Sequence, residues 1–380
     1  MAAMFASLAA WLFPSFGVLR KGFDQPAHFD FSALVILACW YLLIFMSFTV
    51  GEKLGGMVVL YRSNSPERIL SLNSNLLYGL FTLLSAIGIA TTVIKIFQSL
   101  SLAQAIAFIA LGEANSLKEA LYEDYSIGLV SLRYLVLYSG SIALYRIIRF
   151  RSLTLLNILN ILMLGAAALL LGSRLIFVAT LLTAIVALTF DKTSIKFNFT
   201  KLIFFGTLLF LVLSALNYSR NADYYERNNL SFGLAGVSEI LAYLGGPFQG
   251  SIGSAGVTDQ LVAGGDQTFR DYVDVEINLN TDSAFVHLHE QMGYASWVYI
   301  AGMCLFMGFV FEFLMSLGKT IFLLPSGAIL YGSAELWRLD LFHQGIFIVW
   351  FVLGIGLPLS LIGGRRFLVI LGGGGIASAA

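Results

Sequence analysis

Long apolar runs, separated by short polar segments, follow one another along almost the whole chain. A bilayer core of about 30 Å is crossed by roughly 20 mostly apolar residues in a helix, and most of these runs reach that length. On this criterion the pattern predicts about ten spans: 3–19, 31–50, 74–97, 126–147, 152–171, 174–190, 201–217, 293–316, 320–337 and 342–363. The sequence therefore predicts an all-α fold, a polytopic transmembrane helical bundle.

Two of these runs carry a further local signal. The first is short, contains Pro14 and has no basic region before it, so we do not expect a cleaved signal peptide. The stretch 152–190 is nearly twice as long as one span, and Gly172, Ser173 and Arg174 interrupt it. This interruption predicts a tight helical hairpin.

One polar segment, 218–292, is much longer than the other connections. It is rich in Gly, Asn, Asp and Tyr without a strong period, so we expect short helices and irregular chain there. The chain then divides into an N-terminal bundle of about seven spans (1–217), this large loop, C-terminal spans (293–363) and a tail (364–380).

Lysine and arginine are concentrated in every second short connection. One set holds Lys53, Arg62, Arg68, Arg146, Arg149, Arg151, Lys192, Lys196, Lys201, Lys319, Arg365 and Arg366. The alternate set holds only Arg20, Lys21, Lys118, Arg174 and Arg338. Short cytoplasmic loops carry the excess of basic residues, so both termini are expected in the cytoplasm and the loop 218–292 outside it.

The composition narrows the class of protein further. The chain is 58% hydrophobic and 12% charged, whereas soluble proteins carry about 25% charged residues. Its 22 basic and 22 acidic residues cancel, which argues against a nucleic-acid partner. Cys39 and Cys304 both lie in apolar runs, so we expect neither a disulfide framework nor a cysteine metal cluster, and no cofactor.

The acidic residues and the histidines are unevenly distributed between the two predicted sides. All acidic residues except Glu52, Glu67, Asp191 and Glu312 fall on the outer side. The histidines, also predicted outside or at the outer membrane edge, are His28, His287, His289 and His343. Titratable chemistry is therefore expected on the face away from the cytoplasm.

Six arginines are predicted in or near the outer half of the bundle: Arg133, Arg174, Arg220, Arg227, Arg270 and Arg338. Arg133 lies inside a span, where the cost of insertion requires it to face the bundle interior or a wet cavity. Guanidinium groups bind phosphate oxygens bidentately, so converging arginines would suit a pyrophosphate. The structural alternatives are an acidic partner in a neighbouring helix for Arg133, lipid phosphates for Arg174, and Glu335 or Asp340 for Arg338.

The densest polar run is the junction 280–293, where the large loop enters the next span. Asp282 could act as a general base there, or Thr281 or Asp282 could simply cap the helix that follows. In a helix, Asp282 and His289 would share one face while His287 points elsewhere. A metal site made of His287, His289 and Glu290 is a weaker alternative because a further ligand is missing at sensible spacing.

Three segments give the chain a resemblance to a known family. They are Leu171-Gly-Ser-Arg-Leu-Ile-Phe177, Asn217-Tyr-Ser-Arg-Asn221, which opens the large loop, and the junction that ends in Gln291-Met-Gly293. The chain resembles, from about 70 to 363, the O-antigen or oligosaccharide repeat-unit polymerases (Wzy-type) of bacterial envelopes, which are related to the O-antigen ligases. Much of this resemblance is one of topology.

The resemblance implies a GT-C-like membrane glycosyltransferase of the bacterial inner membrane, with an active site facing the periplasm and a role in lipopolysaccharide or other polysaccharide biosynthesis. The growing glycan would pass from undecaprenyl pyrophosphate to a sugar hydroxyl of an incoming lipid-linked unit. Membrane lipids, a chain-length regulator and a flippase are the implied partners. Ligases have a histidine where this chain has Asp282, which favours the polymerase.

On this interpretation Arg174, Arg220 and Asp282 are the expected catalytic residues. Further contacts with the substrate are expected from Arg133, Arg227, Arg270, His289, Arg338 and His343. The alternatives are an O-antigen ligase and a transporter or flippase of lipid-linked glycans. A transporter often shows internal repeats and polar helix breaks near the midplane, and we find no repeat in the sequence.

Overall fold

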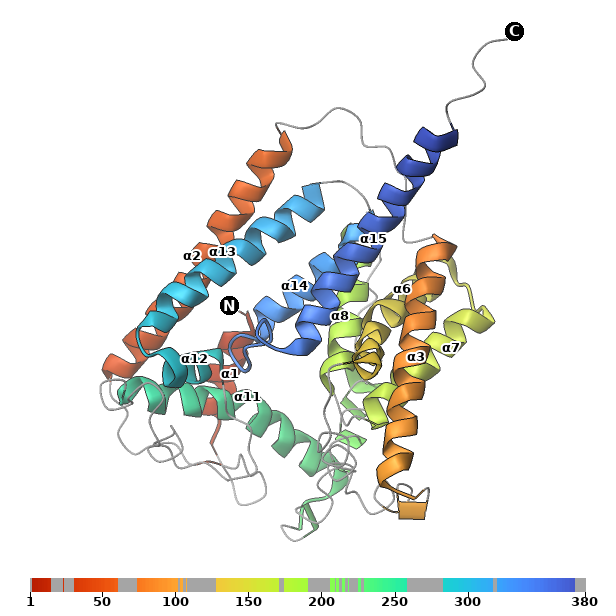
Figure 1. Cartoon of the computed structure of the whole chain (residues 1–380). Coiled ribbons are helices and arrows are strands. Elements are labelled where there is room, and N and C mark those ends of the chain that lie inside the picture. The colour runs from red at the N-terminus through yellow and green to blue at the C-terminus, as the bar shows by residue number, and fades with distance from the viewer. Residues whose placement is uncertain are drawn as a thin grey trace.

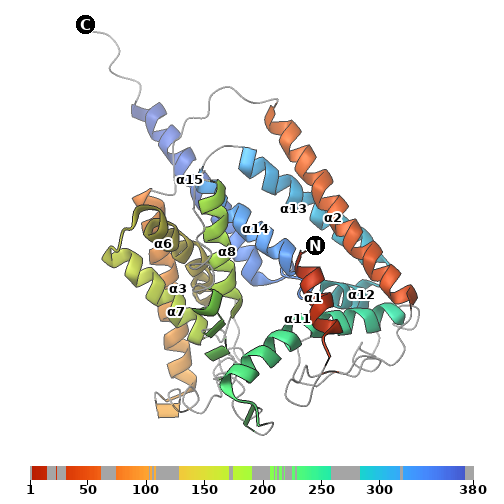
Figure 2. The same ribbon diagram turned by 180° about the vertical axis from the view of Figure 1, so that it is seen from behind.

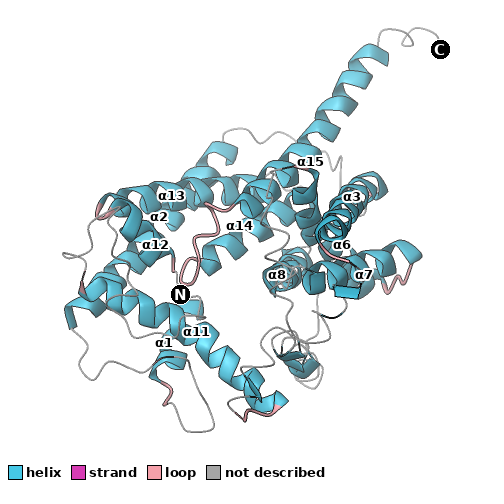
Figure 3. Ribbon diagram, turned by 60° about the horizontal axis from the view of Figure 1, so that its bottom comes forward, coloured by secondary structure: helices cyan, strands magenta, loops and turns pink. Residues whose placement is uncertain are grey.

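In the computed structural model, all of the secondary structure that is described apart from a single bridge residue is helical (Figure 3). The structure describes residues 2–14, 23, 31–60, 74–101, 103–104, 107, 128–170, 174–190, 206–208, 210–211, 214–215, 218, 225–226, 229–257, 283–316 and 320–372. The helices are α1 (Ala2–Leu12), α2 (Phe31–Leu60), α3 (Asn75–Ser99), η1 (Leu129–Leu135), α6 (Val136–Phe150), α7 (Leu155–Leu170), α8 (Arg174–Phe190), α11 (Phe232–Gly256), α12 (Ala284–Met292), α13 (Ala295–Ser316), η3 (Thr320–Phe322), α14 (Leu323–Glu335) and α15 (Gly345–Gly372).

The helices form two groups joined by a central pair (Figure 1). α2 and α13 pack side by side along their lengths, and α1, α11 and α12 lie across one end of this pair. α3, α6, α7 and α8 form the second group, which Figure 2 shows from behind. α14 and α15 lie between the groups, because α14 contacts α8 and α13, and α15 contacts η1.

Three helices are long and apolar enough to cross a membrane, over Phe31–Val58, Asn75–Gln98 and Ala295–Ser316. Shorter apolar helices lie at Leu155–Ala168, Leu175–Phe190 and Gly345–Leu361. In the three long helices only 28 to 33% of the most apolar window is buried inside the protein. An apolar surface of this extent indicates contact with lipid, and the count of about ten spans stays a prediction.

α14 is the central helix of the molecule. Residues 321–329, from η3 into α14, are all buried, so this segment is covered on every side by other helices. A Cβ atom at Gly327 would lie 2.9 Å from the side chain of Thr183, so α14 needs a glycine to approach α8 this closely. The hairpin predicted at 152–190 is present as α7 and α8, which contact each other.

The contact between α2 and α13 depends on small residues. Cβ atoms added at Gly51 or Gly55 would overlap the backbone of α13, and one at Gly308 would overlap the backbone of α2 at Phe48. Gly51 and Gly55 are four residues apart, which is the small-residue spacing that lets membrane helices pack backbone to backbone.

Three predicted elements differ from those observed. In the predicted span 3–19 the helix α1 ends at Leu12, just before Pro14, because proline interrupts the helical hydrogen bonds, and residues 15–19 lie outside the described residues. The span 126–147 begins with the 3₁₀-helix η1 and continues as α6. At the C-terminus α15 continues beyond 363 to Gly372.

The large loop 218–292 also differs from the prediction of short helices. It contains α11, a helix of 25 residues that continues through Pro247. Its C-terminal half is buried, and Gly245 lies so close to α1 that a Cβ atom there would be 3.1 Å from the backbone nitrogen of Trp11. The glycines that made this segment look irregular in the sequence are what allow α11 to pack closely.

The two ends of the helical bundle differ in charge among the described residues. α2, α13 and α15 end near the upper edge of Figure 1, where α3 begins. α6 ends at the same edge, because Arg146 donates to Asn75 at the start of α3 at 3.1 Å. Lys53, Arg149 and Arg151 also lie at or near these helix ends. The connection between α14 and α15 lies at the opposite end, which holds the candidate site.

Candidate functional site

Buried charged side chains gather where α14 ends and α15 begins. The connecting segment, residues 336–344, is held against α12 by a hydrogen bond from the backbone N–H of Ala284 to the carbonyl of Leu336 at 3.2 Å. We call this segment, with Glu335 and the facing His287 of α12, the α14–α15 junction. It contains two of the residues expected to bind substrate, Arg338 and His343.

Arg338 is almost fully buried and is held by two neighbours. Its Nε donates to Glu335 at 2.8 Å, and Nη2 forms an ion pair with the same carboxylate at 2.6 Å. The guanidinium also lies over the ring of Tyr243 from α11, with 4.4 Å between Cζ and the ring centroid. Burial lowers the pKa of Arg338, but Tyr243, Glu335 and Tyr331 raise that pKa by more, so the group stays charged.

The pairing with Glu335 is the structural alternative that the sequence left open for Arg338. Glu335 does not occupy all the N–H groups of the guanidinium, because a guanidinium has more N–H donors than one carboxylate can accept. Arg338 therefore connects α11 to the α14–α15 junction and can still donate to a second anion, such as a phosphate.

Asp340 is a buried carboxylate of the junction with one unsatisfied oxygen. Its side chain is 3% exposed, and its Oδ2 atom accepts no hydrogen bond. Backbone N–H groups of His343 and Phe342 donate to the carboxylate. Burial raises the pKa of Asp340, while His343, His287 and these backbone donors hold the rise down. A buried carboxylate with one oxygen unsatisfied is costly, and such groups cluster at functional sites.

Two histidines from different elements lie beside Asp340. The ring of His287 in α12 and the ring of His343 in the connecting segment are 6.3 Å apart and nearly perpendicular, at 84°. His287 is half-buried, and its Nε2 contacts the side-chain nitrogen of Gln291 at 3.2 Å. His343 is exposed, so the pair leads from the buried carboxylate to the surface.

The start of α12 is fixed by serines rather than by Asp282. Ser283 is the N-cap, because its side chain accepts from the backbone N–H of Val286 at 3.2 Å. The Ser283 and Ser251 hydroxyls are 2.6 Å apart, and Ser251 also bonds with Tyr41 of α2. The prediction that Thr281 or Asp282 caps the helix is therefore wrong, and α12 is tied to α11 and α2.

His289 lies on a different face of α12, away from His287. Its side chain is 1% exposed and stacks on Phe285, with ring centroids 5.4 Å apart, while Tyr294 meets it edge-on at 5.5 Å. Phe285 in turn packs against Trp40 of α2 at 5.2 Å. His289 is thus part of an aromatic row inside the protein, and its expected contact with substrate stays a prediction.

Arg133 faces the interior of the bundle, as its position in an apolar run predicted. It is 1% exposed in η1, donates to the hydroxyl of Tyr134 at 2.9 Å, and lies 3.4 Å from that of Thr92 in α3. No carboxylate among the described residues pairs with it, so the acidic partner considered from the sequence is not found there. Tyr134 contacts α15 through its carbonyl, which accepts from Trp350 at 2.7 Å.

The other predicted site residues give little or no geometry. Arg174 is the first residue of α8, but its side chain is not described. Arg220, Arg227, Arg270 and Asp282 lie outside the described residues. Their convergence on one site is therefore untested.

A metal site at the junction finds no geometric support. His287 and His289 point to different neighbours, and in the part of the chain that the structure describes no three His, Cys, Asp or Glu side chains are placed to hold a metal ion. The alternative with His287, His289 and Glu290 therefore has no set of ligands.

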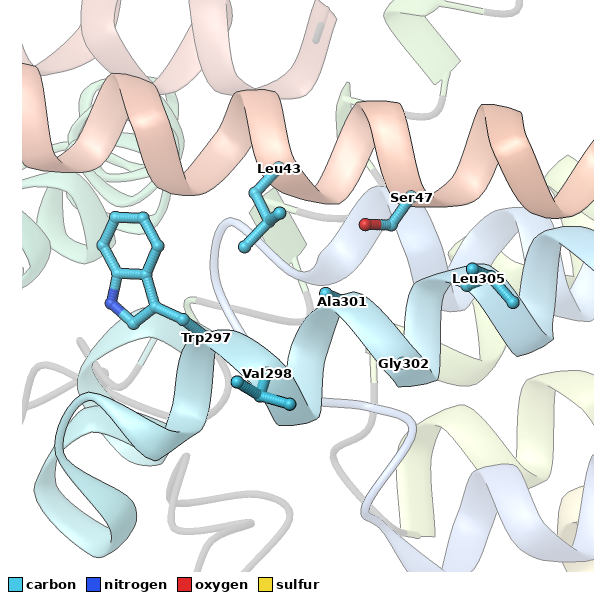
Figure 4. A pocket seen from close by; sticks show the side chains of 7 residues that line it. All are labelled: Leu43, Ser47, Trp297, Val298, Ala301, Gly302 and Leu305. Carbon is cyan, nitrogen blue, oxygen red and sulfur yellow. The ribbon is translucent and has the colours of Figure 1, made fainter.

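An apolar groove of about 450 Å³ lies between α2 and α13 (Figure 4). It is lined by Leu43, Ser47, Trp297, Val298, Ala301, Gly302 and Leu305. Trp297 packs on Trp40, with ring centroids 5.4 Å apart, and Trp40 also packs on Phe285 of α12. The groove therefore lies next to the aromatic side chains around His289. None of the lining side chains is charged, so the groove suits hydrocarbon rather than the reacting groups of a substrate.

Sequence reasoning missed Asp340 and His287 as parts of one site. The cluster from Glu335 to Asp340 was visible as a charged segment between two apolar runs. However, it is tertiary packing that places α12 next to this segment and leaves Oδ2 of Asp340 without a donor.

A search of family models, of curated proteins and of solved structures finds no match to this chain.

Proposed function

We propose that the chain is an integral-membrane glycosyltransferase that polymerises lipid-linked oligosaccharide repeat units. The growing glycan moves from undecaprenyl pyrophosphate to a sugar hydroxyl of an incoming lipid-linked unit. The reaction takes place on the periplasmic face of the bacterial inner membrane. The chemistry needs a cation near the departing pyrophosphate and a positioned acceptor hydroxyl, but no sugar nucleotide.

The observation that carries this proposal is the composition of the α14–α15 junction. A largely buried arginine, Arg338, and a buried carboxylate, Asp340, with one oxygen that accepts no hydrogen bond are two residues apart at one end of an apolar helical bundle. Two histidines lie beside the carboxylate. A cation for a leaving phosphate and groups that can accept a proton are thus close together.

The surroundings of the junction fit a lipid-linked substrate. The apolar groove between α2 and α13 would accept a hydrocarbon chain, and its wall connects through Trp40 and Phe285 to α12 at the junction. The basic end of the described bundle is the opposite one. Short basic connections lie in the cytoplasm, so the junction would face the periplasm, where lipid-linked glycans are presented.

In the proposed reaction the bond between the anomeric carbon and the pyrophosphate oxygen breaks, and the electron pair leaves with the oxygen. Arg338 would stabilise this developing charge, because a guanidinium fixed by Glu335 and Tyr243 needs no reorganisation during the step. The further candidates for the second pyrophosphate, which the incoming unit carries, are Arg174, Arg220 and Arg133, which has no carboxylate partner among the described residues.

The test is polymerisation by the purified protein in proteoliposomes that contain only a lipid-pyrophosphate repeat unit. We expect a ladder of longer glycans without any sugar nucleotide, and a single transfer to a lipid A core instead would indicate the ligase. Arg338→Lys, Arg174→Ala and Arg220→Ala should each lower the rate by about 10²–10³-fold, which is typical for removal of one transition-state donor. Intact substrate that yields no ladder with the wild-type protein contradicts the proposal.

A further inference from the structure

We propose that His343, with Asp340 behind it and His287 beside it, is the proton-accepting side of the site. The acceptor sugar would give its hydroxyl proton to the imidazole of His343. Asp340 would be a positioning residue that fixes the segment and stabilises the resulting imidazolium. This inference rests on the proposed function and adds the identity of the base, for which the sequence offered Asp282 as one candidate.

His343 differs from Asp340 and His287 in the exposure of its side chain and in its contacts. Asp340 is 3% exposed and cannot reach a sugar directly, whereas His343 is exposed at the end of the helical bundle. His287 is half-buried, and Gln291, one turn further along α12, already contacts its Nε2. Of the residues beside Asp340, His343 is therefore the one that an acceptor hydroxyl can approach.

Backbone hydrogen bonds hold the Asp340 carboxylate against the segment that carries His343. Backbone N–H groups of Phe342 and His343 donate to Asp340, so the segment folds back over its own aspartate and carries His343 with it. Oδ2 remains without a hydrogen bond. The other groups that sense its charge are His287 from α12 and Tyr299 and Cys304 from α13. Among these, only the histidines can gain a positive charge.

The step moves one proton to His343 and one electron pair to the leaving pyrophosphate. The acceptor oxygen forms a bond to the anomeric carbon as its proton moves to the imidazole nitrogen of His343. The bond from that carbon to the pyrophosphate breaks, and undecaprenyl pyrophosphate leaves with the electron pair. The imidazolium next to Asp340 then releases its proton to water at the surface, which restores the neutral base.

The experiment measures the pH profile of the polymerisation rate with the wild-type protein, His343→Gln, Asp340→Asn and a control outside the junction, Ile348→Ala, whose side chain in α15 is 53% exposed. The wild-type rate should fall on the acid side, because a protonated imidazole accepts no proton. His343→Gln should lower the rate by about 10²–10⁴-fold and abolish this fall. Asp340→Asn should lower the rate and move the acid limb to lower pH, because the imidazolium loses its anionic neighbour.

Each possible outcome of this experiment has a different meaning. Ile348→Ala should keep both the rate and the profile. A wild-type protein that makes no ladder contradicts the proposed function and this inference together. A wild-type ladder combined with an unchanged rate and profile in His343→Gln overturns the inference alone. A lower rate in Asp340→Asn with an unmoved acid limb would reduce Asp340 to a structural residue.

Discussion

At the scale of single residues, Arg338, Arg133 and Asp340 are charged side chains with little exposure to water, and each has a different set of partners. Arg338 has a carboxylate and the ring of Tyr243, Arg133 has two neutral hydroxyl groups and the ring of Tyr134, and Asp340 has backbone donors while its Oδ2 accepts no hydrogen bond. Removing a charge from water costs several kcal/mol unless its partners compensate. The raised pKa of Asp340 shows that burial disfavours its charged form in the fold.

This imbalance predicts how stability depends on pH. The pKa of Asp340 is raised in the folded protein by burial, so its contribution favours the fold below the ordinary aspartate pKa of 3.8 and is lost as pH rises through the folded pKa. Asp340→Asn removes the buried negative charge but keeps the shape. We expect Asp340→Asn to melt at a higher temperature than the wild-type protein at pH 8 in detergent, with the difference shrinking as pH falls towards 4.

Glu335→Gln is the matched control for this experiment, because it neutralises a buried carboxylate that does have a charged partner. It should lower the melting temperature at pH 8, since Arg338 then loses its ion pair. If Asp340→Asn is destabilising to the same degree at pH 8, the negative charge of Asp340 is compensated in the fold.

Residue types in the sequence predicted some of these environments and not others. An arginine inside an apolar run has to face the interior, and Arg133 does. Thr281, Asp282 and Ser283 are all good capping residues, so the sequence could not identify Ser283 as the N-cap. The unsatisfied oxygen of Asp340 depends on which helices surround the segment, and no local pattern encodes that.

At the scale of elements, the predicted span 126–147 contains an irregular segment at Leu129–Leu135. It forms seven residues of 3₁₀-helix, η1, although runs longer than three or four residues are uncommon. η1 packs against α3 at Gly88, where an added Cβ atom would overlap the backbone of Arg133. The close approach at Gly88 thus fixes the position of a buried arginine.

Gly88→Ala should therefore destabilise the protein, by about 1–3 kcal/mol, because η1 has to move away from α3. Gly79→Ala in the same helix is the control, since nothing lies within 4 Å of a Cβ atom there. It should be neutral or stabilising by up to about 1 kcal/mol, from the better helix propensity of alanine. Chemical denaturation in detergent measures both, and equal effects at the two positions would contradict the packing argument.

Periodicity and length were sufficient to predict α2, α3, α7, α8 and α13, because long apolar runs leave little choice of structure. They failed at α11, whose glycines and Pro247 are typical of loops. In the fold the same glycines admit α1 and the segment near Ser214 at close range, and the helix gains its stability from those contacts. Element type there is decided by tertiary packing, which the sequence pattern did not contain.

At the scale of the whole molecule, the described helices separate a basic end from an end that holds the α14–α15 junction. Arg151 is exposed at the C-cap of α6 at the first end, and His343 is exposed at the second. If the positive-inside rule sets the orientation, the two residues lie on opposite sides of the membrane. A membrane-impermeant thiol reagent added to intact spheroplasts can distinguish the sides.

The labelling uses a background without reactive thiols, made with Cys39→Ser and Cys304→Ala, because Cys39 is exposed and Cys304 is buried. In this background His343→Cys should react in intact spheroplasts, and Arg151→Cys only after the membrane is permeabilised. Detergent-solubilised protein, in which both should react, controls for local accessibility. The reverse pattern would put the junction in the cytoplasm, where lipid-linked glycans facing the periplasm could not reach it, and would therefore exclude the proposed function whatever the chemistry of Arg338 and Asp340.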